Sequence, residues 1–289
     1  MPNSRGTSQW TRGRNGTLPT RLRYVLGLSR ITGTTVQLIF AFALAWLTPS
    51  AAHAGFFERL LNGRLGTVQD GAYLAGDQIT FQVQHTGKIY LLRFGSDPET
   101  FVLSSDHTSL GGRMLKYDSG EIAIRVSGWG ALTLYTDAQP NGLPAVRTGD
   151  APAIGPPAVS VKDVQFIAAQ EAERLQQLRH LRIAFIVDWS VLETSADLRS
   201  TASEAMANAA AGIERFVQDR DSRKAIAKHI NRVSLATGKG PSLRLEQKTL
   251  IVRFNPERGY SGCASSRAIA RQLGDLLTAT KKAQVAGRG

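Results

Sequence analysis

The sequence predicts an α+β protein, with an N-terminal antiparallel β-meander followed by helices packed on a small antiparallel sheet. Three observations predict this fold class. Apolar and polar residues alternate between Gly71 and Thr136, and apolar residues recur every three to four positions from Val164 to Leu181. The period of two then returns from Val233 to Phe254. Short strands with close turns indicate that the meander closes as a small barrel or packs as a sandwich.

A leader precedes the folded regions. Residues 38–54, LIFAFALAWLTPSAAHA, join an unbroken apolar run to helix-breaking Pro49 and a small-residue pattern. Six arginines and no acidic residue come before this run. The pattern is typical of a secretory signal peptide over residues 1–54, with cleavage between Ala54 and Gly55. An uncleaved anchor is the alternative, although the apolar run is about half the ~20 residues that cross a bilayer.

The leader determines the predicted compartment and contributes half of the net charge of the chain. We expect a periplasmic or secreted protein with no transmembrane segment in its mature form, and the sequence makes no prediction of its oligomeric state. The net charge falls from +12 to +6 when the leader's six arginines are removed, and the compartment excludes nucleic acid as a partner. Cys263 is the only cysteine, so the chain cannot form an intramolecular disulfide.

The β region is predicted over residues 55–138. Alternation across residues 78–84 is typical of a half-buried strand, and His85-Thr86-Gly87 supplies the turn that follows. The later strands are predicted at Lys88–Phe94, Phe101–Leu103, Arg113–Tyr117, Glu121–Ser127 and Ala131–Tyr135. In the fourth of these, Ile122, Ile124 and Val126 are expected to share one face.

Residues 139–158 are interpreted as a linker, because they hold five prolines and three glycines without apolar periodicity. An α+β region then covers residues 159–280, and a polar tail covers 281–289. Its helices are predicted after Ser160, over about Asp197–Gln218, over Ser222–Asn231, and after Ser265. The apolar run Ile183–Val187 either extends the first helix or forms a buried strand.

Few residues carry a catalytic pattern. Tyr260-Ser261-Gly262-Cys263 resembles the Ser-Gly-Cys core of cell-wall L,D-transpeptidases, which place a histidine beside it. Here no histidine follows His229, and Cys263 also fits a small, partly buried residue before a helix. No two histidines have metal-ligand spacing. We predict no catalytic residue, no metal site and no cofactor.

A band of basic residues is the strongest non-random feature. From Arg223 to Arg271, eleven basic residues accompany two acidic ones. The anion-binding candidates are Arg223, Lys224, Lys228, Arg232 and Arg244. Lys224 and Lys228 lie one helical turn apart, Arg232 continues this row, and Arg244 alternates with leucines on a strand. The expected partners are phosphates of lipopolysaccharide, anionic lipid headgroups or cell-wall carboxylates. The alternative is an ordinary solvated basic face.

Two segments resemble a known family. They are RMLKYDSGEIAIRVSGWGALTLYTDAQPNGLPAVR over 113–147, and Gly259-Tyr260-Ser261-Gly262 with Ser265-Ser266-Arg267. Both are similar to an uncharacterised family of exported bacterial proteins known only as a domain of unknown function. The resemblance implies export and brings no activity, cofactor or catalytic residue.

These observations predict an exported, non-catalytic cell-envelope protein whose C-terminal half presents a basic surface to an anionic partner. One alternative is a cell-envelope hydrolase or transferase, for which Cys263 is the only residue to nominate. The other is a structural or assembly partner that binds proteins through Phe56–Leu61 and the β region.

Overall fold

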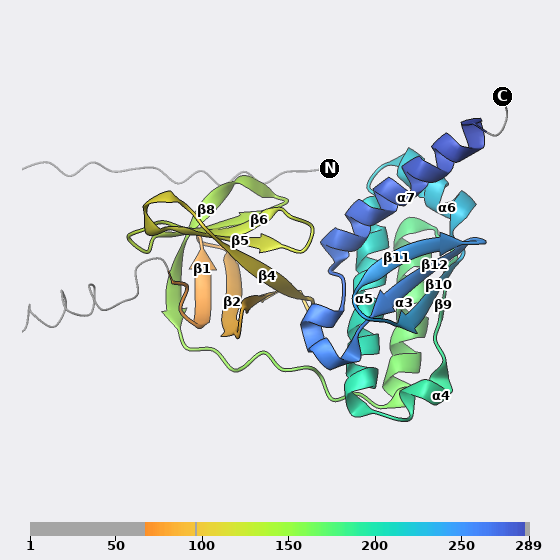
Figure 1. The fold of residues 1–289 in the computed structure, drawn as a ribbon, viewed down its shortest axis with the longest axis horizontal. Helices are drawn as coiled ribbons and strands as arrows, with labels where there is room; N and C mark the ends of the chain where they lie inside the picture. The colour runs from red at the N-terminus through yellow and green to blue at the C-terminus, as the bar shows by residue number, and fades with distance from the viewer. Residues whose placement is uncertain (1–66, 96, 287–289) are drawn as a thin grey trace, which may run out of the picture. The chain divides into compact units, whose positions relative to one another are not determined.

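The computed structural model describes residues 67–95 and 97–286. The leader, the cleavage site at Ala54–Gly55 and the segment Phe56–Leu61 lie outside the described residues. The described residues all belong to one compact unit. An eight-stranded antiparallel barrel is followed by helices and a small four-stranded sheet (Figure 1), which confirms the predicted α+β class.

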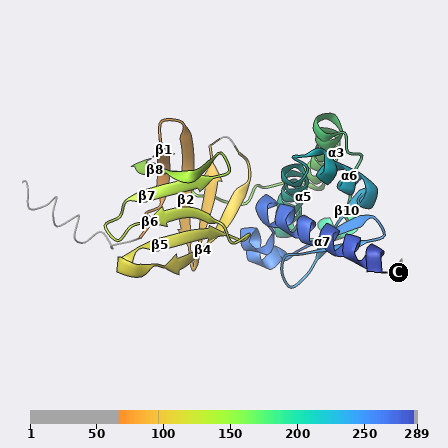
Figure 2. The ribbon, with the colours of Figure 1, turned by 90° about the horizontal axis from the view of Figure 1, so that it is seen from above.

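The β region is a closed barrel, one of the two predicted arrangements. Each strand pairs with the next along the chain, and β1 also pairs with β8 (Figure 2). The strands are β1 (Gly71–Ala75), β2 (Ile79–Thr86), β3 (Ile89–Phe94), β4 (Thr100–His107), β5 (Arg113–Tyr117), β6 (Ile122–Val126), β7 (Leu132–Thr136) and β8 (Gln139–Gly149). A short 3-10 turn, η1 (Ser109–Gly111), lies between β4 and β5.

The barrel interior is filled with side chains. Five aromatic rings contact one another in series, with centroids 5.2 to 6.4 Å apart: Tyr73, Phe81, Phe94, Phe101 and Tyr117. Tilted and edge-on ring pairs of this kind add to the stability gained from burial alone. The barrel is therefore held by a packed core.

The predicted linker at 139–158 is wrong over its first half, because residues 139–149 form β8, the strand that closes the barrel. The Pro144 carbonyl faces β1 and accepts a hydrogen bond from the Gly76 amide, beyond the last β1–β8 pair, Ala75 with Ala145. A backbone N–H at Pro144 would face β1 at the same point, past the end of the β1–β8 ladder. Proline is tolerated there because its missing N–H removes no hydrogen bond from this ladder. Residues 150–160 have no regular secondary structure.

The predicted alternation in β6 is also wrong. The β5–β6 pairing shifts register between Leu115 and Lys116, which is a β-bulge. As a result Ala123 and Ile124 are both buried, whereas Ile122 is exposed. The bulge turns Ile122 away from the face that it was expected to share with Ile124.

The second half contains four main helices and two short ones. They are α3 (Val161–Arg179), α4 (Trp189–Leu192), α5 (Ala196–Phe216), α6 (Arg220–His229), the 3-10 helix η2 (Pro256–Gly262) and α7 (Ser266–Ala286). Ser160 begins α3 with a capping box completed by Asp163. The helix α7 continues to Ala286, so the predicted tail at 281–289 is wrong over its first six residues. None of the described helices is long and apolar enough to span a membrane.

The small sheet is mixed, not antiparallel as predicted. Its order is β11 (Ser242–Glu246), β12 (Thr249–Phe254), β10 (Arg232–Thr237) and β9 (Ala184–Ile186), so the run Ile183–Val187 supplies a strand. Only β11 and β12 are antiparallel, and β10 runs parallel to both β12 and β9. Helices α4 to α6 connect β9 to β10, and a helical crossover places consecutive strands in parallel.

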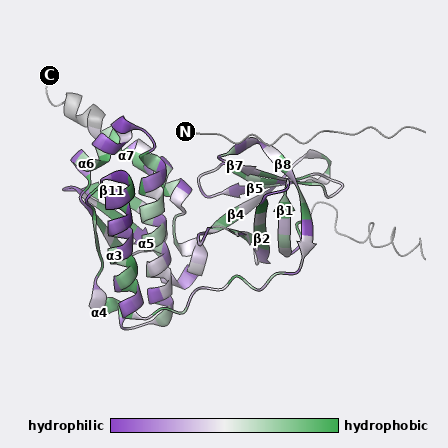
Figure 3. Ribbon diagram, turned by 180° about the vertical axis from the view of Figure 1, so that it is seen from behind, coloured by the Kyte–Doolittle hydropathy of each residue, from purple (hydrophilic) through white to green (hydrophobic). Residues whose placement is uncertain are grey.

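One face of this sheet packs on helices. Helices α3, α5 and α7 contact its strands, and their apolar residues join the sheet in one core. Green and purple residues alternate along α3 and α5 in Figure 3, as expected for amphipathic helices.

The N-terminus of α7 is bound by acidic residues of the barrel. The Ser266 amide and hydroxyl donate to the two carboxylate oxygens of Glu99, at 2.7 and 2.6 Å, and the Ser265 amide donates to Asp118 at 2.7 Å. Arg267 pairs with Glu121 at 2.6 Å and lies 4.3 Å from the centre of the Tyr117 ring. Carboxylates suit a helix N-terminus because its free amides carry partial positive charge.

Candidate functional site

The sheet face opposite the helices is not covered by any described helix. Buried residues on the strands, such as Val233, Leu250 and Val252, point to the helix side, while their neighbours along each strand are exposed or half-buried. Three arginines project from the uncovered side: Arg232 on β10, Arg244 on β11 and Arg253 on β12. We call this side the basic sheet face.

Strand register arranges the residues of the basic sheet face in rows. One row contains Arg232, Thr249 and Glu246, a second contains Ser234, Ile251 and Arg244, and a third contains Ala236, Arg253 and Ser242. Each row therefore joins one arginine to at least one hydroxyl group. Arginine forks and hydroxyls are the donors that bind phosphate and carboxylate oxygens.

Neither Arg232 nor Arg253 has an ion-pair partner within the described part of the chain, whereas Arg244 pairs with Glu246 at 2.8 Å. The first two guanidinium groups therefore have donors available for a ligand. A hollow of about 610 Å³ lies on this face, and its one carboxylate, Glu246, is the partner of Arg244. The hollow is lined by Arg232, Ser234, Glu246, Gln247, Thr249 and Ile251.

The turn between β11 and β12 places a further cation, Lys248, beside the start of β10. Gln247 and Lys248 both have positive φ, 42° and 65°, as in the tight hairpin turns that twist with the strands. The Lys248 carbonyl accepts hydrogen bonds from the amides of Asn231 and Arg232, at 2.9 and 3.3 Å. The turn is thereby fixed beside the start of β10.

His229, the last residue of α6, lies close enough to two lysines for their charges to act on it. Partial burial lowers the pKa of its imidazole, and the charges of Lys228 and Lys248 lower it further. The charge of Lys248 therefore acts on His229, although the two residues are 19 positions apart in sequence. An anion bound here would relieve their repulsion.

The structure brings together some of the five anion-binding candidates. Arg232 and Arg244 lie on the basic sheet face, and Lys228 lies at its edge near Lys248. Arg223 is half-buried on α6, and Lys224 is exposed with Asp221 4.0 Å away. Arg232 does not continue the helical row, because α6 ends at His229 and the next residue is extended. The candidates therefore occupy a helix and a sheet, not one helical row.

Arg253 and Lys248 belong to the basic band but not to the five candidates. Arg253 alternates with Val252 and Phe254 in the same way that Arg244 alternates with leucines, so the period of two could have identified it. Lys248 could not be found by periodicity, because it lies in a turn.

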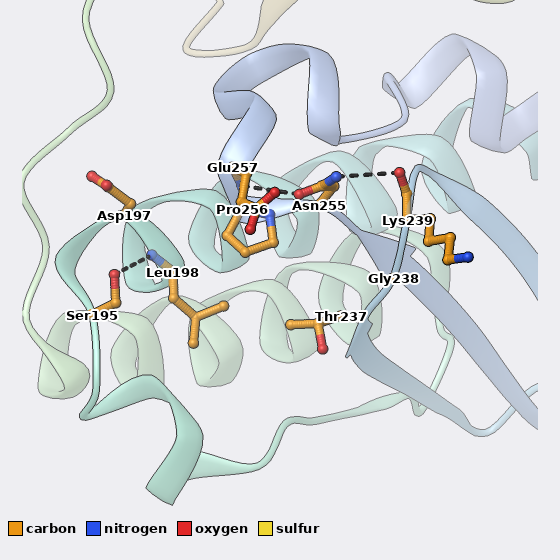
Figure 4. A pocket seen from close by; sticks show the side chains of 9 residues that line it. All are labelled: Ser195, Asp197, Leu198, Thr237, Gly238, Lys239, Asn255, Pro256 and Glu257. Atoms are coloured by element: carbon orange, nitrogen blue, oxygen red, sulfur yellow. Dashed lines mark hydrogen bonds between the residues drawn. The ribbon is translucent and has the colours of Figure 1, made fainter.

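A different pocket lies at the carboxyl ends of β10 and β12, next to the start of α5. It measures about 720 Å³ and includes Ser195, Asp197, Lys239 and Glu257 (Figure 4). Crevices at the carboxyl ends of parallel strands often bind ligands. Here the two carboxylates outnumber the single lysine. In Figure 4 Asp197 and Lys239 lie at opposite ends of the group and point apart. This pocket is therefore a poor match for an anion.

A third hollow, of about 540 Å³, is lined by residues 97–99 and by helices α3 and α5. Burial raises the pKa of Glu204, and it raises that of Glu99 to about 7. Perturbed carboxyls in a cleft can mark an active site. Most charges here already have partners, since Glu99 binds the N-terminus of α7 and Arg174 pairs with Glu171 and Glu214. These groups stabilise the fold.

Cys263 is buried, and its thiol donates to the Thr201 carbonyl with a sulfur–oxygen distance of 3.4 Å. Burial raises the pKa of the thiol, and the nearby charge of Glu204 adds to the effect. The thiolate that a nucleophile requires is therefore disfavoured, which speaks against Cys263 as a catalytic residue. Among residues 67–95 and 97–286, no three acidic, histidine or cysteine side chains are grouped to hold a metal ion.

Comparison with known proteins identifies a family but no activity. No curated protein and no solved structure matches the chain. The family model described as a domain of unknown function (DUF4908) matches residues 60–273, which include the whole barrel, the mixed sheet and the start of α7. This match confirms the resemblance carried by residues 113–147 and 259–267. The chain belongs to the family defined by this domain of unknown function, DUF4908.

Proposed function

We propose that this protein is an exported, non-catalytic cell-envelope protein whose basic sheet face binds an anionic envelope component. The ligand carries phosphate or carboxylate groups, as lipopolysaccharide, anionic lipid headgroups and cell-wall polymers do. The observation that carries the proposal is the hollow beside Arg232, on a face where Arg232 and Arg253 have no described ion-pair partner. Export is supported by the signal-peptide pattern of residues 1–54.

The arrangement favours an extended, multiply charged ligand. Arg232, Arg244 and Arg253 are spread over three neighbouring strands, and strands in a sheet lie about 4.8 Å apart. Several anionic groups along one polymer or membrane surface would meet several of these cations at once. Exposed charges act weakly one at a time in salt solution, so binding depends on their number.

The test compares the wild-type protein with Arg232→Glu, Arg253→Glu and the double variant. Binding is measured by co-sedimentation with lipopolysaccharide, with anionic phospholipid vesicles and with cell-wall sacculi. Zwitterionic vesicles serve as the uncharged surface. We expect each reversal to weaken binding to the true ligand roughly tenfold at low ionic strength, because one attractive charge becomes repulsive. Wild-type binding should fall steeply as salt is added.

Lys162→Glu is the matched control. Lys162 is exposed near the start of α3 and does not belong to the basic sheet face, and the substitution changes the net charge equally. If Lys162→Glu weakens binding as much as Arg253→Glu, net charge alone explains the attraction and the proposed site is wrong. Binding that ignores salt would also contradict the proposal. Comparing binding to lipopolysaccharide, to anionic vesicles and to sacculi shows which of these components supplies the anionic groups.

A further inference from the structure

Two large apolar side chains are almost fully exposed at one end of the barrel. Leu110 is 89% exposed in the β4–β5 loop, and Trp129 is 78% exposed in the β6–β7 loop. Both exceed Phe166, which at 69% is the next most exposed large apolar residue described. Scattered apolar residues on a surface need no explanation. Two such residues on neighbouring loop tips do need an explanation.

The two loops are built in contact with each other. A Cβ atom on Gly128 would lie 2.1 Å from the Leu110 carbonyl oxygen, so only glycine permits this approach. A Cβ atom on Gly112 would lie 2.7 Å from the Val126 carbonyl oxygen. Leu110 itself has φ 62°, a left-handed conformation that few residues other than glycine adopt. The backbone thus holds Leu110 outward beside the loop of Trp129.

This end of the barrel faces away from the helices. β4 begins at Thr100, next to the Glu99 that binds α7, and reaches the Leu110 loop after eight residues, about 25 Å along the strand. Arg113 follows one loop and Arg125 precedes the other, and neither has an ion-pair partner in the described ranges. Asp106, the nearby acid, is paired with Lys116 at 2.7 Å. The unpaired charges next to these two loops are therefore positive.

We propose that this end of the barrel docks on a phospholipid bilayer, with Leu110 and Trp129 inserted at the level of the headgroups and Arg113 and Arg125 facing anionic lipids. Tryptophan favours the membrane interface because its ring is apolar and its indole N–H keeps a polar contact. Two exposed apolar side chains on a rigid tip, flanked by cations, fit that interface better than they fit water. The site is separate from the basic sheet face and uses insertion as well as charge.

The test measures partition onto phosphatidylethanolamine–phosphatidylglycerol vesicles at 150 mM salt for the wild type, Trp129→Ala and Leu110→Ala. We expect Trp129→Ala to lower the partition coefficient at least about tenfold, and Leu110→Ala several-fold, since each removes buried apolar area. Lipids brominated near the headgroup should quench wild-type fluorescence more than that of Trp129→Phe. The difference between the two isolates the insertion of Trp129.

Phe166→Ala is the matched control, because it removes another largely exposed aromatic ring, from α3 outside the barrel. Its partition coefficient should equal that of the wild type. Equal partition of wild type and Trp129→Ala, with no quenching by brominated lipid, would overturn the proposal and leave these loops as a protein-binding tip. Loss of binding in Arg232→Glu/Arg253→Glu tests the basic sheet face separately, because that variant keeps Leu110 and Trp129.

Discussion

Replacing Gly212 by alanine should lower the free energy of unfolding by about 1–3 kcal/mol, the range typical of overpacked cores. Gly212 lies where α5 packs on α7, and a Cβ atom there would lie 2.5 Å from Cγ2 of Ile269 and 2.6 Å from its Cβ. Ile269 is fully buried, so it has no space into which to move. Urea denaturation at constant pH measures the change.

Gly274→Ala is the matched control for this prediction. Gly274 lies inside α7, and its Cβ would lie 3.6 Å from the Phe216 ring, an ordinary contact. Alanine should therefore stabilise the protein there by up to about 1 kcal/mol, through its higher helix propensity. The double variant Gly212→Ala/Ile269→Ala should lose less than the sum of its two single changes. A neutral Gly212→Ala would show that α5 and α7 are not packed this closely.

Replacing Glu99 by glutamine should remove a pH dependence of stability worth about 3 kcal/mol between pH 4.5 and 7.5, at 1.36 kcal/mol per pKa unit. Burial raises the pKa of Glu99 from 4.5 to about 7, against the opposing effects of Ser266 on α7 and Arg215 on α5 and the smaller reinforcing charge of Asp97. Between these two pH values the Glu99 carboxyl group is ionised in the unfolded chain but still protonated in the folded chain. Wild-type stability therefore falls as pH rises from 4.5 to 7.

Glutamine cannot ionise, so this contribution is absent from the variant, and other groups titrate in both proteins. The measured quantity is the difference in unfolding free energy between wild type and Glu99→Gln at several pH values. The wild type should lose stability relative to the variant as pH rises, and the difference should level off above pH 7.5. A difference that stays constant with pH would show that Glu99 ionises in the folded state as readily as in water.

The barrel strands could be predicted from the sequence because one face of each strand is buried, which imposes a period of two. The way in which the strands close into a barrel could not be predicted from the sequence. Residues 139–149 carry two prolines and read as a linker, yet they supply β8, since Pro144 lies past the end of the β1–β8 ladder. Similarly, no local pattern reveals the bulge that exposes Ile122. Both depend on strand partners that are distant in sequence.

The mixed sheet shows the same limit. The period of two from Val233 to Phe254 predicted a small antiparallel sheet, and β11 and β12 do pair as antiparallel neighbours through their short turn. The parallel pairing of β10 with β9 depends on the crossover through α4 to α6, and its parallel pairing with β12 depends on β11 lying at the sheet edge. Periodicity encodes neither arrangement. For the basic sheet face, alternation predicted the exposure of Arg244. It did not reveal that the Lys248 turn lies beside His229, because that contact joins separate elements.

The central claim is that an anion binds at the basic sheet face, and the pKa of His229 tests it most directly. NMR titration of the histidine side chains, at low ionic strength with and without inorganic pyrophosphate, measures this value. A bound anion offsets the charges of Lys228 and Lys248, so the pKa of His229 should rise from its lowered value. His85 and His107 lie on strands of the barrel, so their NMR signals serve as the internal control. An unchanged His229, or equal changes at His229 and at both barrel histidines, would contradict the account.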